Sequence, residues 1–177
     1  MESVRSIERK NVNLLECVNE ACREPIFSDT DRDLISLDIE NSLVVLVDKR
    51  LLSQVITNLI RNSLRAIKHI PQGQIKISAQ KLQNRLSVII HDNGTGINST
   101  QQKNLFKPFY NLSTNGVGIG LAFSKLALES MGCSIACESK EGSFTRFTLT
   151  FMSLVNEKDA ENEIATCIPI PHHNSFT

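Results

Sequence analysis

The sequence predicts an α+β fold, a two-layer sandwich in which a mixed, mainly antiparallel sheet carries its helices on one face. Segments with helical periodicity are interrupted by runs of alternating apolar and polar residues, and several of these runs follow one another directly. Strands and helices alternate too seldom for a doubly wound sheet. The chain has 177 residues, which suits one domain with room for a tail.

The composition is that of a globular protein without a polyanionic partner. Hydrophobic residues make up 41% of the chain, and 19 basic residues balance 19 acidic ones, so the formal net charge is zero. A balanced charge argues against binding to nucleic acid. The longest apolar run covers residues 43–47, far fewer than the roughly 20 residues that cross a bilayer. We therefore expect a chain that does not itself span a membrane.

Five cysteines are scattered along the chain. Their odd number and irregular spacing argue against a secreted disulfide framework and favour a reducing compartment. Cys133 and Cys137 have no second pair of Cys or His residues at zinc-ligand spacing, so a zinc site is not expected.

The first half of the chain predicts a helix, two strands and a longer helix. Residues 11–23 place apolar side chains at helical spacing and stop before a proline. Residues 35–39 alternate, and a turn leads from them to the apolar run at 43–47, as expected for two strands. Asp48 is a suitable N-cap for a helix from residue 49 to about residue 70.

The second half predicts a hairpin, a short helix, a longer helix and two final strands. Residues 74–80 and 85–91 are alternating runs joined by a short polar link, which is typical of an antiparallel hairpin. Ser99 or Thr100 can cap a short helix that ends near residues 106–109. The remaining elements are a helix over residues 119–131, ended by Gly132, and strands over residues 134–138 and 143–151.

The chain divides into three parts. Residues 1–10 are interpreted as the end of a preceding helix or linker, and residues 11–152 as the folded domain. From residue 153 the periodic pattern stops, so residues 153–177 predict a flexible tail. The helix-like character of residues 3–10 favours a fragment of a longer protein.

Two amides mark the long predicted helix. Asn58 and Asn62 lie four residues apart, so they share one face, and Arg65 lies on the same side. Arg61 is expected to point elsewhere. Asn is unfavourable inside a helix, which indicates a polar function for this face. The alternative at this stage is a pair of solvated polar positions.

A glycine-containing loop follows the second strand of the predicted hairpin. Asp92 is held at the strand end, and Gly94 and Gly96 permit close backbone approach. A carboxylate fixed in this way can accept a hydrogen bond from an exocyclic amine such as that of adenine. An ordinary turn is the alternative.

A second glycine-rich segment opens the helix predicted from residue 119. Gly116, Gly118 and Gly120 leave room for a phosphate at the exposed amides of a helix start. No GKS or GKT follows, which excludes a Walker loop, and no strand precedes the segment, which excludes a Rossmann fingerprint. Taken alone, the pattern also fits a flexible loop.

In order along the chain, these three segments resemble the N, G1 and G2 boxes of the GHKL ATP-binding superfamily. The sequence LFKPF at residues 105–109 resembles its F box. Within the superfamily, DKRLLSQVITNLIRNS at residues 48–63 is most similar to the catalytic and ATP-binding domain of sensor histidine kinases. The resemblance covers residues 11–151, and residues 116–151 also resemble the quorum-sensing hybrid kinases.

The resemblance implies a binding site for ATP and Mg²⁺. Asn62 would be the Mg²⁺ ligand, with Asn58 as a second candidate, and Arg65 would contact phosphate. Asp92 would accept the adenine amino group. The implied catalytic residues are thus Asn58, Asn62 and Arg65. The implied ATP-binding residues are Asn62, Asp92, Gly94, Gly96, Ile97, Phe109, Gly116, Val117, Gly118, Ile119, Gly120 and Leu121.

The lid that the family closes over the nucleotide corresponds to residues 111–117, with Phe106 and Phe109 at its near end. Many relatives place a cation for the γ-phosphate in this lid. This sequence has no Lys or Arg between Tyr110 and Gly120. The contact would therefore fall to Arg65, or to Lys107 or Lys125 outside the lid.

Asn58 also separates this chain from relatives that hydrolyse ATP. Gyrase-like ATPases carry a Glu at or near this position as general base, and an amide cannot accept the proton of an attacking water. The resemblance therefore implies transfer of the γ-phosphoryl group to a protein nucleophile. Such transfer needs mainly positioning and charge neutralisation.

The phosphoacceptor segment of the family, a His-Glu or His-Asp pair in a dimerisation helix, is absent from this sequence. We therefore expect the acceptor histidine on a separate dimerisation domain of the parent sensor kinase, a response regulator as indirect partner, and a cytoplasmic location. Two alternatives stay open. One is a degenerate nucleotide-binding module that signals without transfer, and the other is a serine kinase of the anti-sigma type.

Overall fold

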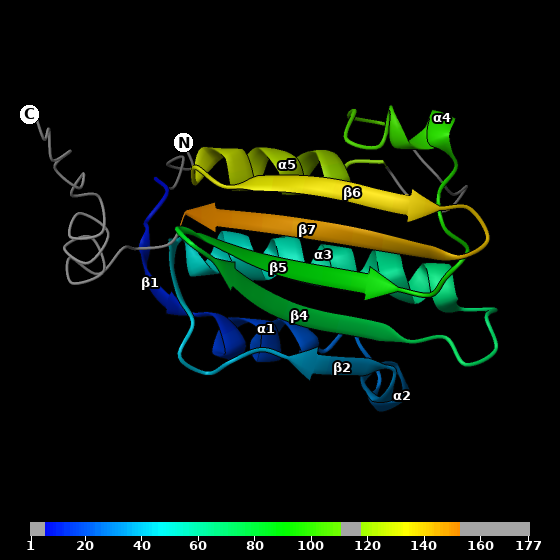
Figure 1. The fold of residues 1–177 in the computed structure, drawn as a ribbon, viewed down its shortest axis with the longest axis horizontal. Helices are drawn as coiled ribbons and strands as arrows, with labels where there is room; N and C mark the ends of the chain where they lie inside the picture. The colour runs from blue at the N-terminus through cyan, green and yellow to red at the C-terminus, as the bar shows by residue number, and fades with distance from the viewer. Residues whose placement is uncertain (1–5, 111–117, 153–177) are drawn as a thin grey trace, which may run out of the picture.

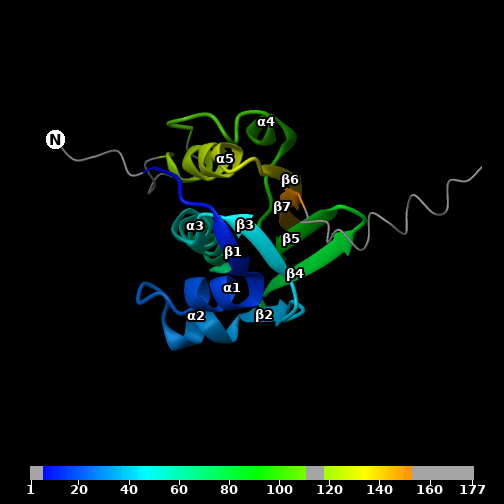
Figure 2. The ribbon, with the colours of Figure 1, turned by 90° about the vertical axis from the view of Figure 1, so that its left-hand side faces the viewer.

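Residues 6–110 and 118–152 are described by the computed structural model. A five-stranded sheet forms one layer, and three helices lie side by side on one of its faces (Figures 1 and 2). The helices are α1 (Leu14–Cys22), α3 (Lys49–Ile67) and α5 (Gly120–Ser130), and α3 contacts both of the others. The predicted α+β sandwich is confirmed.

The large sheet has the strand order β2, β4, β5, β7, β6. Strands β4, β5, β7 and β6 pair antiparallel, whereas the short edge strand β2 pairs parallel with β4. The mixed, mainly antiparallel character and the predicted hairpin, β4–β5, are therefore confirmed. The strands are β2 (Ile35–Asp38), β4 (Ile75–Leu82), β5 (Arg85–Asp92), β6 (Ser134–Lys140) and β7 (Phe144–Met152).

A second sheet of two strands changes the predicted start of the first helix. Lys10–Asn13 forms β1, which pairs antiparallel with β3 (Val44–Val47), so the prediction of helix from residue 11 was wrong. The Asn13 side chain accepts a hydrogen bond from the backbone amide of Glu16. An N-cap residue of this kind precedes its helix, and α1 therefore begins at Leu14.

The strands predicted over residues 35–39 and 43–47 both form, but they join different sheets. The first is β2 at the edge of the large sheet, and the second is β3 in the small one. Their partners, β4 and β1, lie far away in the sequence. Local alternation identifies a strand without identifying its partner.

Capping residues set the start of the two short helices. The N-cap of α4 (Ser99–Gln102) is Asn98, one residue before the predicted caps, because Asn98 and Gln101 exchange side-chain-to-backbone hydrogen bonds in a capping box. α4 ends at Gln102, so the predicted end near residues 106–109 was wrong. α2 (Asp29–Asp33) lies in a polar stretch without a predicted element, and a capping box at Ser28 begins it.

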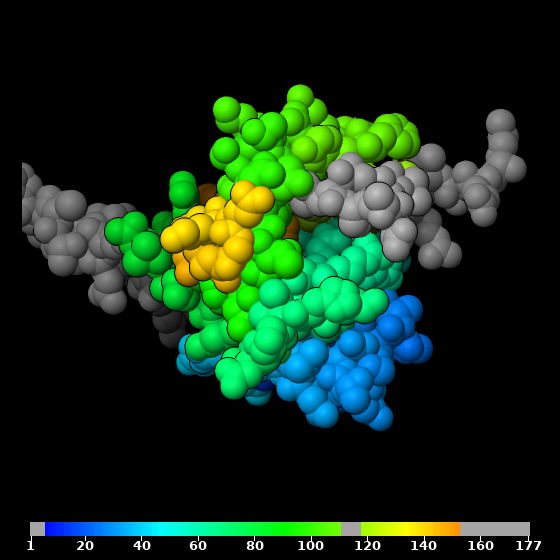
Figure 3. All heavy atoms as spheres, turned by 90° about the vertical axis from the view of Figure 1, so that its right-hand side faces the viewer, coloured from blue at the N-terminus to red at the C-terminus, as the bar shows by residue number. Residues whose placement is uncertain are grey.

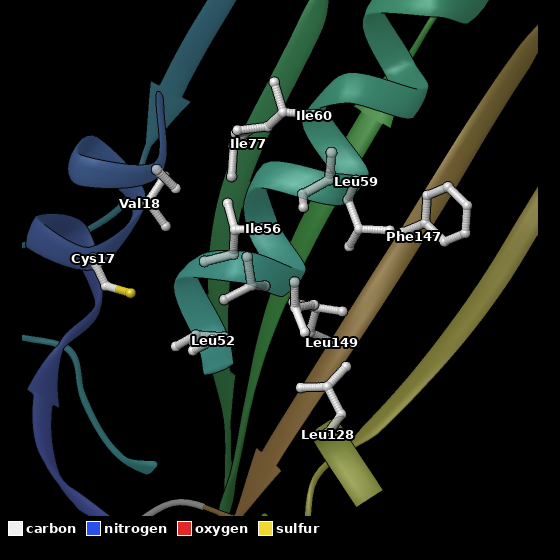
Figure 4. Packing of buried hydrophobic residues seen from close by; sticks show 14 of the residues in the cluster. Cys17, Val18, Leu52, Ile56, Leu59, Ile60, Ile77, Leu128, Phe147 and Leu149 are labelled. Carbon is white, nitrogen blue, oxygen red and sulfur yellow. The ribbon is translucent and has the colours of Figure 1, made fainter. Parts of the chain in front are cut away.

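α3 forms the centre of the core. Its inward face repeats apolar residues every three or four positions, so Leu52, Ile56 and Leu59 are fully buried. They belong to the same buried cluster as Ile77 and Leu149 of the sheet (Figure 4). Burial of side chains of this size stabilises the fold by roughly 1.5–3 kcal/mol each. This packing fixes the orientation of α3 and turns all of its polar residues except the buried Ser63 away from the core.

α3 ends at Ile67 rather than near Ile70 as predicted. A turn follows, in which the Ile70 amide donates to the Ile67 carbonyl. Among the helices of residues 6–110 and 118–152, none combines the length and the apolar character of a transmembrane segment.

Candidate functional site

The Asn58 side chain joins α3 to the start of α5. Its Nδ2 donates to Ser124 Oγ over 2.9 Å, and that hydroxyl donates to the Gly120 carbonyl over 2.9 Å. A side chain at Gly120 would clash with the Asn58 amide. Gly120 is therefore required for the close approach of the two helices, and Asn58 holds the first turn of α5 against the middle of α3.

Asn62 and Arg65 follow Asn58 towards the end of α3. Asn62 is half-buried and Arg65 is exposed. Within the described residues, no salt bridge involves Arg65. An amide and a cation on one outward face are thus available to a ligand.

Asp92, at the end of β5, is a buried carboxylate with only 1% of its surface exposed. Its Oδ2 accepts a hydrogen bond of 2.7 Å from Ser63 Oγ of α3, and its Oδ1 accepts one of 3.0 Å from the Gly94 amide. Burial raises the pKa of Asp92, although these two hydrogen bonds act in the opposite direction. The contacts fix the carboxylate and leave its remaining lone pairs available to an amine donor.

The two glycines after Asp92 pack against the protein itself. A Cβ at Gly94 would lie 2.7 Å from the Cβ of Ala66, and the Thr95 amide donates to the Ala66 carbonyl over 3.2 Å. Gly96 has a φ of +64°, and a side chain there would clash with the Lys140 carbonyl. These glycines therefore seat the loop on the end of α3 and on the β6–β7 turn.

The side chain of Ile97 completes this loop by pointing into the core, where it is buried. Its amide donates to Ser139 Oγ over 2.8 Å. Figure 3 shows the loop after β5, the β6–β7 turn and the residues after α3 as one continuous surface.

The N-terminal end of α5 and the residues before it are more exposed than the loop after β5. Phe109 has a φ of +63° and 77% exposure, and its amide donates to the Gly118 carbonyl over 3.0 Å. Ile119 is exposed and gives α5 no side-chain cap, and Leu121 is half-buried. The first amides of α5 are therefore free of a side-chain acceptor at the cap.

Gly116 and Val117, two of the implied ATP-binding residues, lie outside the described residues. Phe106, at the near end of the predicted lid, is half-buried and packs against the core. The Lys125 ammonium lies 5.8 Å from the centre of its ring, a cation–π contact.

Most of the residues implied for ATP and Mg²⁺ binding thus lie on α3 or on segments that contact it. Its middle contacts the start of α5 through Asn58, and its end contacts the loop after β5 through Ser63 and Ala66. Sequence reasoning did not single out Ser63, Ala66 or Ser124. Small or hydroxyl side chains among larger apolar neighbours on a helix were the signal that could have found them.

An open groove of about 480 Å³ runs along the outward face of α3. Arg61 and Asn58 both line it, whereas Asn62 and Arg65 do not. The lining residues are Glu24, Ile26, Ser53, Gln54, Thr57, Asn58, Arg61 and Phe123.

The family model described as "Histidine kinase-, DNA gyrase B-, and HSP90-like ATPase" matches residues 47–154. This chain belongs to that ATPase family. The match includes α3, the loop after β5 and the start of α5.

Curated relatives of this ATPase domain are kinases, a sensor kinase among them. The chain is 33% identical over 128 residues to the autoinducer 1 sensor kinase/phosphatase LuxN of Vibrio harveyi, covering 72% of this chain and 15% of LuxN. It is 32% identical over 115 residues to sporulation kinase B of Bacillus subtilis, covering 65% of this chain and 27% of that kinase. The chain therefore spans less than a third of each relative.

Solved structures agree with this placement. The catalytic domain of histidine kinase ThkA superimposes with a TM-score of 0.69 at 25% identity, over 82% of this chain and 96% of that domain. The mycobacterial sensor histidine kinase MprB, at 17% identity and a TM-score of 0.69 over 81% of this chain and 97% of that one, shows the same fold. The ATPase domain described here is thus of the nucleotide-binding type found in sensor histidine kinases.

Proposed function

We propose that this chain is the ATP-binding catalytic domain of a two-component sensor histidine kinase. It transfers the γ-phosphoryl group of ATP to a histidine on a separate dimerisation domain, from which the group passes to a response regulator. The observation that carries this proposal is the engagement of Asn58 between α3 and α5, where a hydrolytic relative would need a general base.

The chemistry of Asn58 supports transfer rather than hydrolysis. An amide does not take a proton from water at neutral pH, and its nitrogen already donates to Ser124. With no base at this position, the incoming nucleophile has to react without losing a proton to this residue. A histidine brought by the dimerisation domain meets that requirement, since its neutral imidazole is itself nucleophilic.

Asp92 suits the recognition of adenine. The Ser63 hydroxyl and the Gly94 amide hold its carboxylate in one orientation. An acceptor fixed in a buried site discriminates strongly for a ligand that supplies the matching donor, because a ligand without it leaves the carboxylate unpaired. We assign the exocyclic amine of adenine to this acceptor.

The side chains on α3 fit a magnesium ion. Mg²⁺ prefers oxygen ligands, keeps several waters and is bound by a few protein groups together with phosphates. The Asn62 oxygen is the first ligand in this assignment. Asn58 Oδ1 lies against Gly120, and we assign it to support the ion or its waters while Nδ2 donates to Ser124. When bound, the ion neutralises charge on the phosphate oxygens.

Arg65 and the first amides of α5 bind the phosphates from two sides. Arg65 is an exposed cation one turn from Asn62, and the amides at the start of α5 carry the positive end of the helix dipole. Phosphoryl transfer draws mainly on such positioning and charge neutralisation. We place the phosphoacceptor outside residues 6–110 and 118–152, because His69 and His91 lie beside α3 and in β5.

A domain of this kind acts as part of a larger protein. The folded part, predicted as residues 11–152, also includes Lys10 of β1. It would work next to the dimerisation domain of a parent sensor, with the residues before β1 as the connection and residues 153–177 as a tail. We place it in the cytoplasm. Relatives such as the sensor kinase/phosphatase LuxN carry such a segment as 15% of their length.

A degenerate module that binds nucleotide without transfer is the second candidate. The absence of Lys and Arg between Tyr110 and Gly120 favours it, since a lid without a cation neutralises the γ-phosphate less well. The serine kinase of the anti-sigma type gains no support from the relatives described above, a sensor kinase/phosphatase and a sporulation kinase.

The proposal is tested by mixing the chain with a separately made dimerisation domain and ATP labelled on its γ-phosphate. We expect label on the dimerisation domain that is lost in acid and retained in base, as phosphohistidine is. Label released as free phosphate at the same rate with and without that domain would contradict transfer. Binding of ATP without any movement of label would favour the degenerate module.

A further inference from the structure

The charges on α3 are unbalanced. This helix of 19 residues contains Lys49, Arg50, Arg61 and Arg65 and no Asp or Glu. Arg61 and Arg65 lie one turn apart, a spacing at which like charges repel and disfavour the helix. Such a pair is tolerated more readily where an anion binds beside it.

The rest of the described chain does not neutralise this pair. Within residues 6–110 and 118–152, no salt bridge involves Arg61 or Arg65. Glu24 lines the same groove as Arg61, yet the two do not form a salt bridge. By contrast, Lys49 pairs with Glu20 over 2.7 Å and Arg50 with Asp48 over 3.8 Å.

The groove that contains Arg61 shares one residue, Asn58, with the site proposed for the phosphates. Asn58 and Arg61 line it together, and the Asn58 amide also contacts Gly120 at the start of α5. A phosphate chain held between Asn62 and the first turn of α5 therefore ends next to the groove. An Arg side chain on the neighbouring turn of α3 is long enough to meet that end.

We propose that the Arg61 guanidinium binds the terminal phosphate of ATP, the contact that a cation-containing lid would otherwise make. The inference rests on the proposed function, because it needs the nucleotide to lie between α3 and α5. It adds a residue that distinguishes ATP from ADP. The planar guanidinium can donate two parallel hydrogen bonds to one phosphate.

The test compares Arg61→Gln, Arg61→Lys and the unmodified chain by calorimetric titration with ATP and with ADP. Arg61→Gln is expected to weaken ATP binding by roughly tenfold, as loss of a hydrogen-bonded charge contact does, and to leave ADP binding within about twofold. Arg61→Lys keeps the charge but cannot donate two parallel hydrogen bonds to one phosphate. Its ATP affinity is therefore expected to lie between those of Arg61→Gln and the unmodified chain. Arg85→Gln, at the exposed start of β5, is the matched control.

The outcomes separate this inference from the function on which it rests. If the unmodified chain binds neither nucleotide, the proposed function fails. If it binds both and Arg61→Gln leaves the ATP-to-ADP affinity ratio unchanged, Arg61 does not contact the terminal phosphate. Unchanged affinities combined with slower transfer to the dimerisation domain would place Arg61 against that domain and would also overturn the inference.

Discussion

Asp92 is a carboxylate that the fold keeps almost entirely out of water. Burial raises its pKa, so the protein bears a free-energy cost to hold a charge at this position. The Ser63 hydroxyl and the Gly94 amide offset part of this cost. A ligand donor at the remaining lone pairs would offset more, which is the physical reason for assigning adenine to this residue.

Asp92→Asn is expected to weaken ATP binding at least tenfold, because the amide has one acceptor oxygen where the carboxylate has two. The Ser63 hydroxyl can accept from the new amide group, so the domain should still fold. Calorimetric titration with ATP measures the affinity, and thermal unfolding checks the fold. An affinity equal to that of the unmodified chain would remove Asp92 from the adenine site.

Asn62→Ala is expected to abolish the dependence of ATP binding on Mg²⁺, because the variant lacks the side-chain oxygen assigned to the ion. Titration with and without Mg²⁺ gives the ratio of affinities. Asn19→Ala, on α1, is the control for loss of a partly buried amide outside the site. A full Mg²⁺ response in Asn62→Ala would refute the metal role.

The contact between α3 and α5 depends on the absence of a side chain at Gly120. Gly120 leaves space for the Asn58 amide, and the Asn58 and Ser124 side chains fill that space with hydrogen bonds. At the level of elements, this contact sets where the first turn of α5 stands relative to the polar face of α3. The position of the proposed phosphate site follows from it.

Gly120→Ala is expected to destabilise the domain by about 1–3 kcal/mol, the usual effect of overpacking. Asn58→Ala in the same chain should restore part of that loss by making room for the new methyl group. Urea unfolding of the two single variants and the double variant yields their coupling free energy. Additive effects would show that the two positions do not touch.

Asp48 begins α3 as its N-cap. Burial opposes its ionisation, but hydrogen bonds from the amides of Leu51, Glu8 and Arg50 hold the pKa of Asp48 below its usual value. A carboxyl whose pKa is lower in the folded state contributes stability above its unfolded pKa of about 3.9, and that contribution is lost as pH falls through the folded pKa.

Asp48→Asn is therefore expected to be less stable than the unmodified chain near pH 6 and to match it more closely as pH falls below about 4. Asparagine is itself a good N-cap, so the variant isolates the effect of the charge. Urea unfolding across this pH range measures the difference in free energy. A difference that does not shrink in acid would show that the charge of Asp48 does not stabilise α3.

At the scale of the whole molecule, the sequence predicted the layers and most of the strands and helices because burial imposes a strong local period. The inward face of α3, from Leu52 to Ile67, is an example. Elements without that period were missed or misplaced. β1 has four residues and forms through pairing with the distant β3, and α2 depends on the capping box at Ser28.

In the candidate site too, the sequence predicted features with a local signal and did not predict contacts between distant segments. Residue types identified Asn58, Asn62 and Asp92 as polar groups in places where helices and strands rarely carry them. Contacts between elements could not be predicted in this way. The dependence of Gly120 on Asn58, and of Gly94 on Ala66, results from the packing of α3 against segments distant in sequence.

The central claim is that one helix, α3, presents a site for ATP and Mg²⁺ between α5 and the loop after β5. Its most direct test is calorimetric titration of the unmodified chain with a non-hydrolysable ATP analogue, with and without Mg²⁺. The account predicts binding of one nucleotide per chain that strengthens when Mg²⁺ is present. Absence of binding in both conditions, from a chain shown to be folded, would contradict it.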